Sequence, residues 1–106
     1  MKETPVYLTV THLENAPVRL HLRPGQVLSL KKDHENPYDD EAIAVYSHRQ
    51  VLCGYLANSV HSVARGTCSA GRVYDRIGEC AEGVIRFMPE DSLIIELLEK
   101  DTEADD

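Results

Sequence analysis

The sequence contains no tryptophan, one phenylalanine and three cysteines among its 106 residues. It has no apolar run near the roughly 18 residues that a membrane-spanning helix needs. Residues 1–5 do not resemble the start of a secretory signal, so we expect neither anchor nor export. An odd number of cysteines (Cys53, Cys68 and Cys80) without an export signal is typical of reduced thiols, not of a disulfide framework. The sequence therefore predicts a cytoplasmic protein.

Positive charge is also scarce: 11 basic residues stand against 18 acidic ones, a formal net charge of −7. Such a balance is unusual for a nucleic-acid-binding protein, because phosphate contacts supply most sequence-independent affinity. The excess of acids is concentrated in residues 101–106, which contain four acids and no base. Since a chain of this length is typical of one domain, we expect a single domain at residues 1–100 and an acidic disordered tail at residues 101–106.

Runs rich in β-branched residues, or alternating between apolar and polar residues, predict strands along most of the chain. They lie at residues 5–11, 18–22, 27–31, 41–46, 51–56, 79–88 and 92–98. The last run is also compatible with a helix, because it is short and its periodicity does not decide. Gly54, inside a strand, indicates a bulge or a close backbone approach. Alternation places Ala81, Ile85 and Phe87 on one face of their strand.

Two short helices are expected between the fifth and sixth of these strands. Ser59, or the residue before it, can cap a helix that Gly66 ends, and Thr67 or Ser69 can start a second one that Gly78 ends. Many short strands with a helical insertion favour a barrel, because closure removes exposed strand edges. The predicted fold is therefore α+β, mostly β: a small, partly closed β-barrel with two short inserted helices.

One turn carries most of the functional information. Asn36-Pro37-Tyr38-Asp39 follows Leu28-Ser29-Leu30 and precedes Ala42-Ile43-Ala44-Val45 and Gly54-Tyr55-Leu56. In order and spacing these segments resemble the HIRAN domain, and the resemblance covers about residues 5–65. It implies an OB-like barrel that binds the 3′ end of single-stranded DNA, in a repair or replication context.

The chemistry of the turn is compatible with that function. The Asp39 carboxylate can accept a hydrogen bond from a terminal hydroxyl and would repel a phosphate at the same place. The Tyr38 ring can stack on a base, which is worth roughly 1–3 kcal/mol. Asn36 carries both donors and acceptors, so it can read a base edge or the sugar. The other interpretation is that Asn36 and Asp39 only stabilise the turn and that Tyr38 packs on the barrel.

The chain departs from the family pattern at two places. DNA-binding members carry an aromatic pair where this chain has residues 15–18, and a lysine where it has residues 57–59. Tyr55 is the ring that we expect to replace the pair. The basic residues that we expect at phosphates are Lys31, Lys32, His34 and Arg65. The departures leave open an alternative function, a protein-interaction module that binds a peptide at an edge strand of the same barrel.

A catalytic function has less support. His34, Asp39, Asp40 and Glu41 could supply hard ligands to a divalent cation and hence form a phosphodiester hydrolase. The acids are adjacent, however, so alternation would send them to different sides, and no zinc-ligand spacing occurs. Residues 66–71 lack the spacing of a nucleophile turn. We therefore expect no metal, no cofactor and no enzymatic activity.

Overall fold

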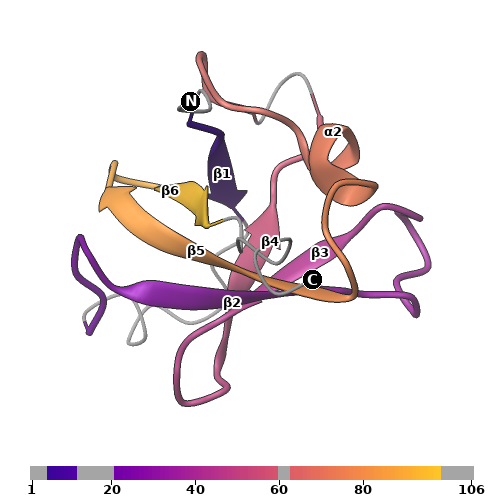
Figure 1. Ribbon diagram of the computed structural model, residues 1–106, viewed down its shortest axis with the longest axis horizontal. Helices are drawn as coiled ribbons and strands as arrows, with labels where there is room; N and C mark the ends of the chain where they lie inside the picture. The colour runs from indigo at the N-terminus through magenta and orange to yellow at the C-terminus, as the bar shows by residue number, and fades with distance from the viewer. Residues whose placement is uncertain (1–4, 12–20, 60–62, 99–106) are drawn as a thin grey trace, which may run out of the picture.

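The structure is a computed structural model that describes residues 5–11, 21–59 and 63–98. Six antiparallel strands form a closed barrel in the order β1-β4-β3-β2-β5-β6, and β6 pairs with β1 to complete the circle (Figure 1). The strands are β1 (Tyr7–Thr11), β2 (Val27–Lys32), β3 (Ile43–Tyr46), β4 (Leu52–Leu56), β5 (Cys80–Phe87) and β6 (Leu93–Leu98). The small OB-like barrel is thus confirmed, and its closure is complete where we expected a partial one.

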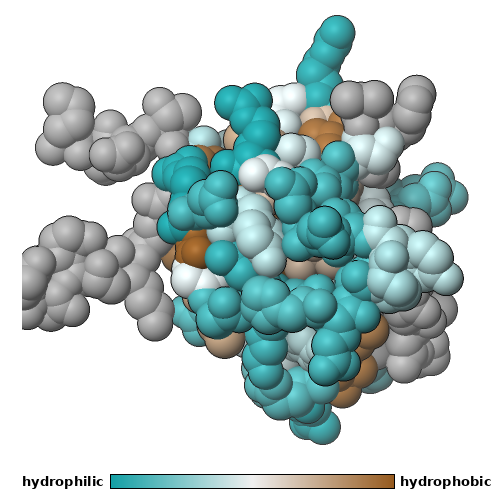
Figure 2. Space-filling view, turned by 90° about the vertical axis from the view of Figure 1, so that its right-hand side faces the viewer, coloured by the Kyte–Doolittle hydropathy of each residue, from teal (hydrophilic) through white to brown (hydrophobic). Residues whose placement is uncertain are grey.

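Alternation along the strands explains why the barrel has an apolar interior. Leu8 and Val10 of β1 are fully buried, as are Leu28 and Leu30 of β2. Burying each such side chain contributes about 1.5–3 kcal/mol. The face on the right of Figure 1 is mostly polar: hydrophilic residues cover most of it, and hydrophobic ones appear there only in small separate patches (Figure 2).

The cysteines are free thiols, in three environments. Cys53 is buried in the core, as its sequence context predicts, and burial raises the pKa of its thiol. Cys68 is partly buried and packs against the core, whereas Cys80 is exposed.

Most of the predicted strands are confirmed, with small differences at their ends. The last run is a strand, because β6 pairs with both β5 and β1. Of the predicted strand at residues 18–22, only His21 and Leu22 are described, and Leu22 is buried. The rest of that prediction lies outside the described residues.

Two irregularities in strand pairing change where side chains point. Val45 pairs with Gly54 and Tyr46 with Leu52, which leaves an extra residue in β4 and confirms the bulge expected at Gly54. A second register shift separates Ile85 from Phe87 in β5. Ile85 is fully buried but Phe87 is 61% exposed, so the predicted common face of these two residues is wrong. A bulge reverses the alternation of the residues that follow it.

The described helix, α2, spans Ala70–Tyr74. The Ser69 hydroxyl caps it by accepting a hydrogen bond from the Arg72 N–H at 3.3 Å, as the sequence indicates. It ends with Asp75 at its C-cap, earlier than the expected end at Gly78. Of the helix predicted between Ser59 and Gly66, residues 60–62 lie outside the described residues, and residues 63–66 are not helical, so that part of the prediction is wrong. No helix in the described part of the chain is long and apolar enough to cross a membrane.

Candidate nucleic-acid interface

The turn between β2 and β3 is held by its own side chains. Asn36 Oδ1 accepts hydrogen bonds from the backbone N–H of Tyr38 at 2.8 Å and of Asp39 at 3.0 Å. Asp39 Oδ1 accepts one from the Glu41 N–H at 2.9 Å. Asn and Asp stabilise turns in this way, so the local sequence dictates the loop shape. This confirms the turn-stabilising part of the interpretation of Asn36 and Asp39 and leaves their ligand-binding part open.

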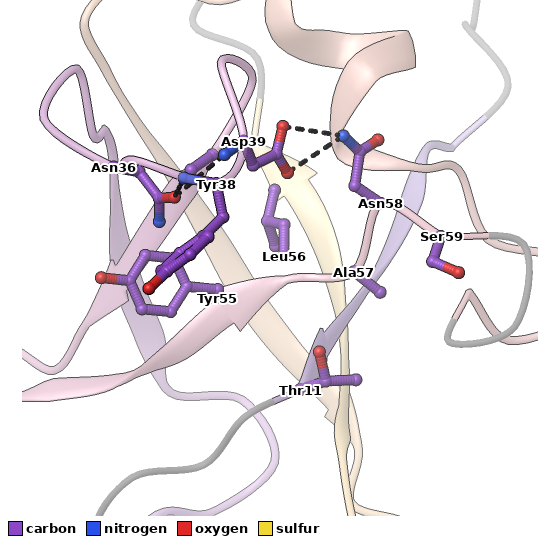
Figure 3. Close-up of a pocket in the computed structure, with 10 residues that line it drawn as sticks. Thr11, Asn36, Tyr38, Asp39, Tyr55, Leu56, Ala57, Asn58 and Ser59 are labelled. Carbon is purple, nitrogen blue, oxygen red and sulfur yellow. Dashed lines mark hydrogen bonds between the residues drawn. The ribbon is translucent and has the colours of Figure 1, made fainter.

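A cavity of about 460 Å³ opens beside this turn, where β1 and β4 end (Figure 3). Its lining comes from the turn, from the ends of these strands and from the segment after β4. The described lining residues are Thr11, Asn36, Tyr38, Asp39, Ala42, Tyr55, Leu56, Ala57, Asn58 and Ser59. We call this cavity the turn pocket. Leu56 and Ala57 are buried and line it with apolar surface, while the Asn and Asp side chains supply hydrogen-bonding groups.

Two tyrosine rings lie on one side of the turn pocket, and Asp39 and Asn58 lie on the other (Figure 3). Tyr38 is 94% exposed, so it does not pack on the barrel and its ring can receive a stacking partner. Tyr55 is half-buried, and its hydroxyl donates to Asp33 Oδ2 at 3.2 Å. The pocket therefore combines a free aromatic face with a second ring that the protein holds in place.

Asn58 connects three parts of the structure. Its Nδ2 donates to both carboxylate oxygens of Asp39, at 3.4 and 3.2 Å, and to Glu41 Oε1 at 3.2 Å. Its Oδ1 accepts from the Gly71 N–H in the first turn of α2 at 2.8 Å. A Cβ at Gly71 would lie 2.5 Å from Glu41 Oε1, so a side chain here would displace the Glu41 carboxylate. Sequence reasoning did not select Asn58, although its place directly after the Gly-containing strand of the motif was a usable signal.

The two neighbouring lysines of β2 point to different places. The Lys31 ammonium lies 5.3 Å from the centre of the Tyr46 ring. The Lys32 ammonium lies 4.3 Å from the centre of the Tyr74 ring and donates to the Ile77 carbonyl at 3.1 Å. Successive residues of a strand face opposite sides, so the pair cannot act together on one phosphate.

The remaining basic candidates also lie outside the turn pocket. His34 Nε2 contacts Glu79 Oε1 at 2.6 Å, in an exposed pair. Arg65 lines a different cavity of about 310 Å³ together with Tyr7 and Phe87. Of the predicted site residues, the structure brings together Asn36, Tyr38, Asp39 and Tyr55. It places Lys31, Lys32, His34 and Arg65 elsewhere.

The surroundings of α2 are acidic. Tyr74 is the last residue of α2, and the pKa of its hydroxyl is raised first by loss of solvation and then by the charges of acidic residues. Those acids are Glu79, Asp75, Asp40 and Glu41. Among the residues that the structure describes, no group of three or more His, Cys, Asp and Glu side chains is placed to hold a metal ion.

Comparison with known proteins agrees with the barrel and the motif. A family model described as the HIRAN domain matches residues 6–97, which is most of the chain. Searches of curated proteins and of solved structures returned no match. HIRAN domains are in general DNA-binding modules. With the match spanning all six strands and the turn pocket, the chain belongs to the HIRAN domain family.

Proposed function

We propose that this chain binds the 3′ end of single-stranded DNA in the turn pocket, in a DNA repair or replication context. The observation that carries the proposal is the Asp39 carboxylate, which lines a cavity beside an exposed aromatic ring. Glu41 N–H and Asn58 hold this carboxylate, and Oδ2 receives only the Asn58 contact among the described residues. A carboxylate has about four acceptor positions, so Oδ2 can accept a further hydrogen bond.

In this proposal each side chain has one task. Asp39 Oδ2 accepts a hydrogen bond from the terminal 3′-hydroxyl, and the charge of this carboxylate repels a terminal phosphate. Tyr38 stacks on the terminal base, and Tyr55 borders the sugar. Asn36 Oδ1 already accepts from two backbone donors, so Nδ2 of the same side chain is the atom that donates to the nucleotide.

The basic residues act farther along the strand in this proposal. Lys31, Lys32, His34 and Arg65 line no part of the turn pocket, so we assign them to backbone phosphates upstream of the terminus. Affinity then comes mainly from stacking and hydrogen bonding at the end of the strand. The expected salt dependence is that of at most four neutralised phosphates, because the slope grows with their number.

The test is a titration of labelled single-stranded oligonucleotides that differ only at the 3′ terminus, carrying a hydroxyl or a phosphate, at two salt concentrations. We expect tighter binding of the hydroxyl end at both concentrations. Equal binding of the two ends would contradict end recognition, and absence of binding at low salt would contradict the DNA-binding site itself.

A second candidate is the protein-interaction module, and one observation favours it. The cavity of about 310 Å³ next to Arg65 is lined by Tyr7, Phe87, Pro89 and Ile94, and Phe87 is 61% exposed. A peptide cannot add to an edge in the way the sequence suggested, since each of the six described strands already pairs with two others. Such a partner would instead dock on these side chains, and Phe87→Ala would abolish its binding in a calorimetric titration.

The proposal also covers the domain organisation of the chain and its lack of catalytic activity. We propose a folded domain at residues 1–100 with an acidic tail at residues 101–106, acting as a binding module without catalytic activity. The free thiols, including the exposed Cys80, fit a reducing compartment such as the cytoplasm.

A further inference from the structure

A third cavity, of about 360 Å³, lies at the end of the barrel where β3 turns into β4. Its volume falls in the range of about 300–1,000 Å³ that is usual for small-molecule pockets. Two segments line it: residues 21–26, which lead into β2, and residues 47–51, which join β3 to β4. Its described lining residues are His21, Leu22, Gln26, Ser47, His48, Arg49 and Val51. We call it the basic cavity, because two histidines and an arginine are the ionisable side chains of that lining.

The basic cavity differs in charge from the chain as a whole. The sequence has 18 acidic residues against 11 lysines and arginines, yet residues 21–26 and 47–51 contain no acid. They add Arg23 to the three basic residues of the lining. Lys31 also reaches this end of the barrel, because its Nζ donates to Gln50 Oε1 at 3.4 Å. Part of the scarce positive charge is thus gathered around one cavity.

No carboxylate neutralises these side chains at close range. Within residues 5–11, 21–59 and 63–98, the ion pairs lie elsewhere, one of them between β5 and β6, and none includes His21, His48 or Arg49. Arginine carries its charge throughout the physiological pH range, and each imidazole offers at least one N–H donor. An anion in the basic cavity would therefore meet a permanent cation and several donors, with no acidic side chain in the described lining to repel it.

The wall formed by residues 47–51 is held in one shape by a tight turn. The Ser47 carbonyl accepts from the Gln50 N–H at 2.9 Å, which closes the turn. The buried Ser47 hydroxyl oxygen accepts from the backbone N–H of Arg49 at 3.2 Å and of Val51 at 3.3 Å. His48 and Arg49 therefore project from a fixed backbone at the tip of the turn.

The facing wall, residues 21–26, is attached to β5. The Gly25 N–H donates to the Ile85 carbonyl at 2.6 Å, and the Ile85 N–H donates to the Gln26 carbonyl at 2.9 Å. Gln26 Oε1 accepts from the Arg23 N–H at 3.0 Å, which leaves its Nε2 as a donor. The buried Leu22 anchors the start of this segment in the core. Because both walls are held in place before a ligand arrives, binding costs little ordering of the chain.

We propose that the basic cavity binds a phosphate group. Its donors stand on two facing walls, an arrangement that fits a tetrahedral anion with oxygens in several directions better than a planar carboxylate. Guanidinium and imidazole groups form the strong, charge-assisted hydrogen bonds that phosphate oxygens accept. The phosphate belongs either to a free phosphate ester or to the backbone of a nucleic-acid strand, and the experiment below distinguishes these two sources.

The basic cavity is separate from the turn pocket. Val51, in its lining, precedes β4, whereas Tyr55 and Leu56 of the turn pocket end that strand. A strand rises about 3.3 Å per residue, so the two sites lie on the order of 15 Å apart. The inference therefore goes beyond the proposed function and does not depend on recognition of a 3′ end.

The experiment follows the backbone amide signals of the ¹⁵N-labelled chain by NMR. One titration adds inorganic phosphate, and another adds a short oligodeoxythymidine without terminal phosphates, both at an ionic strength held constant with sodium chloride. We expect saturable shifts at residues 47–51 and 21–26. Shifts with inorganic phosphate alone would identify a site for free phosphate esters, and shifts with the oligonucleotide alone would identify a site for the strand backbone. Absence of saturable shifts in both segments, with either probe, would overturn the inference.

A matched pair of variants separates the site from the net charge of the chain. Arg49→Gln should weaken binding at residues 47–51 on the order of fivefold, the upper range for an exposed charge pair. Arg72→Gln removes the same charge from an exposed position on α2 that lines none of the three cavities, and should leave that affinity unchanged. Equal losses in the two variants would mean that only net charge matters, and would overturn the inference.

A competition experiment tests the choice of phosphate over carboxylate. A short oligoglutamate peptide should displace the phosphate probe poorly from residues 47–51. Displacement with the affinity of the phosphate probe itself would show that the cavity recognises negative charge of any kind, and would overturn the assignment. Failure of the turn pocket is visible separately, since an oligonucleotide that binds there shifts residues 36–39 instead.

Discussion

Two cavities on the outside of the same barrel differ in chemistry. The turn pocket is lined by hydrogen-bonding side chains at the end of β1 that contains Thr11. The other cavity lies at the Tyr7 end of β1 and presents rings and aliphatic side chains around Arg65. Thr9 lies between them and is buried. Its hydroxyl is satisfied by a hydrogen bond with the Thr67 hydroxyl at 2.8 Å and by one that it accepts from the Ala64 N–H at 3.1 Å.

The difference shows how one strand can serve two surfaces. Leu8 and Val10 point into the core, while the alternate residues Tyr7, Thr9 and Thr11 point outward and meet different loops. The turn pocket offers directional acceptors, which suit the hydroxyl terminus that we propose as its ligand. The apolar cavity offers area and little direction, so it suits stacking or a hydrophobic partner. The predictions below test this division, from the largest expected effect to the smallest.

Removing the acceptor should have the largest effect. Asp39→Ala should abolish the preference for a 3′-hydroxyl over a 3′-phosphate, because a hydrogen bond to a charged group contributes about 1.5–3 kcal/mol. The measurement is the ratio of the two dissociation constants. Asp40→Ala is the matched control, since Asp40 is exposed and does not line the turn pocket. If the Asp39 variant still discriminates the two ends, the assignment of this carboxylate is wrong.

Removing an aromatic ring should distinguish the two cavities. Tyr38→Ala should weaken binding of every single-stranded end by about 1–3 kcal/mol, the stacking contribution. Its thermal stability should change little, because the ring is 94% exposed. Phe87→Ala removes the exposed ring of the other cavity and should leave binding of short oligonucleotides unchanged. A loss in the Phe87 variant equal to that in the Tyr38 variant would show that nucleic acid occupies both cavities.

Removing residues 101–106 should have a smaller, salt-dependent effect. These residues carry four acids and no base, so we expect them to oppose the approach of phosphates to the chain. We expect the truncated chain to bind single strands more tightly at about 0.01 M salt and to lose most of that gain at about 0.1 M. Paired titrations of both chains provide the measurement, and equal affinities at the lower salt would show that the acids do not affect the site. Thermal stability should be nearly unchanged.

Removing divalent metal should have no effect. The described residues hold no cluster that could ligate a metal ion, so binding of oligonucleotides should be the same with and without EDTA. Loss of binding on chelation, or a stoichiometric metal in the purified protein, would revive the hydrolase interpretation.

Much of the fold follows from local patterns in the sequence. Alternation predicts most of the strands, because a barrel strand faces the core with every second residue, as Leu8 and Val10 do. The turn at residues 36–39 is also predictable, because Asn36 and Asp39 accept hydrogen bonds from backbone groups two or three positions away. What short-range patterns cannot report is the register between strands. The exposed position of Phe87 depends on the shift in pairing between β5 and β6, which no local pattern contains.

The candidate site also combines features that follow from the local sequence with features that only the tertiary structure decides. The sequence by itself determined the turn and the carboxylate of Asp39 within it, since these depend on neighbours in the chain. That the Tyr38 ring is 94% exposed was decided by the tertiary structure. Only the tertiary structure decided that Asn58 serves Asp39 and Glu41 together, because these residues are 19 and 17 positions apart along the chain. It also separated Lys32 and His34 from the pocket by giving each a partner near residue 78, some 45 positions away. Contacts at such separations arise from barrel closure, and closure is a property of all six strands together.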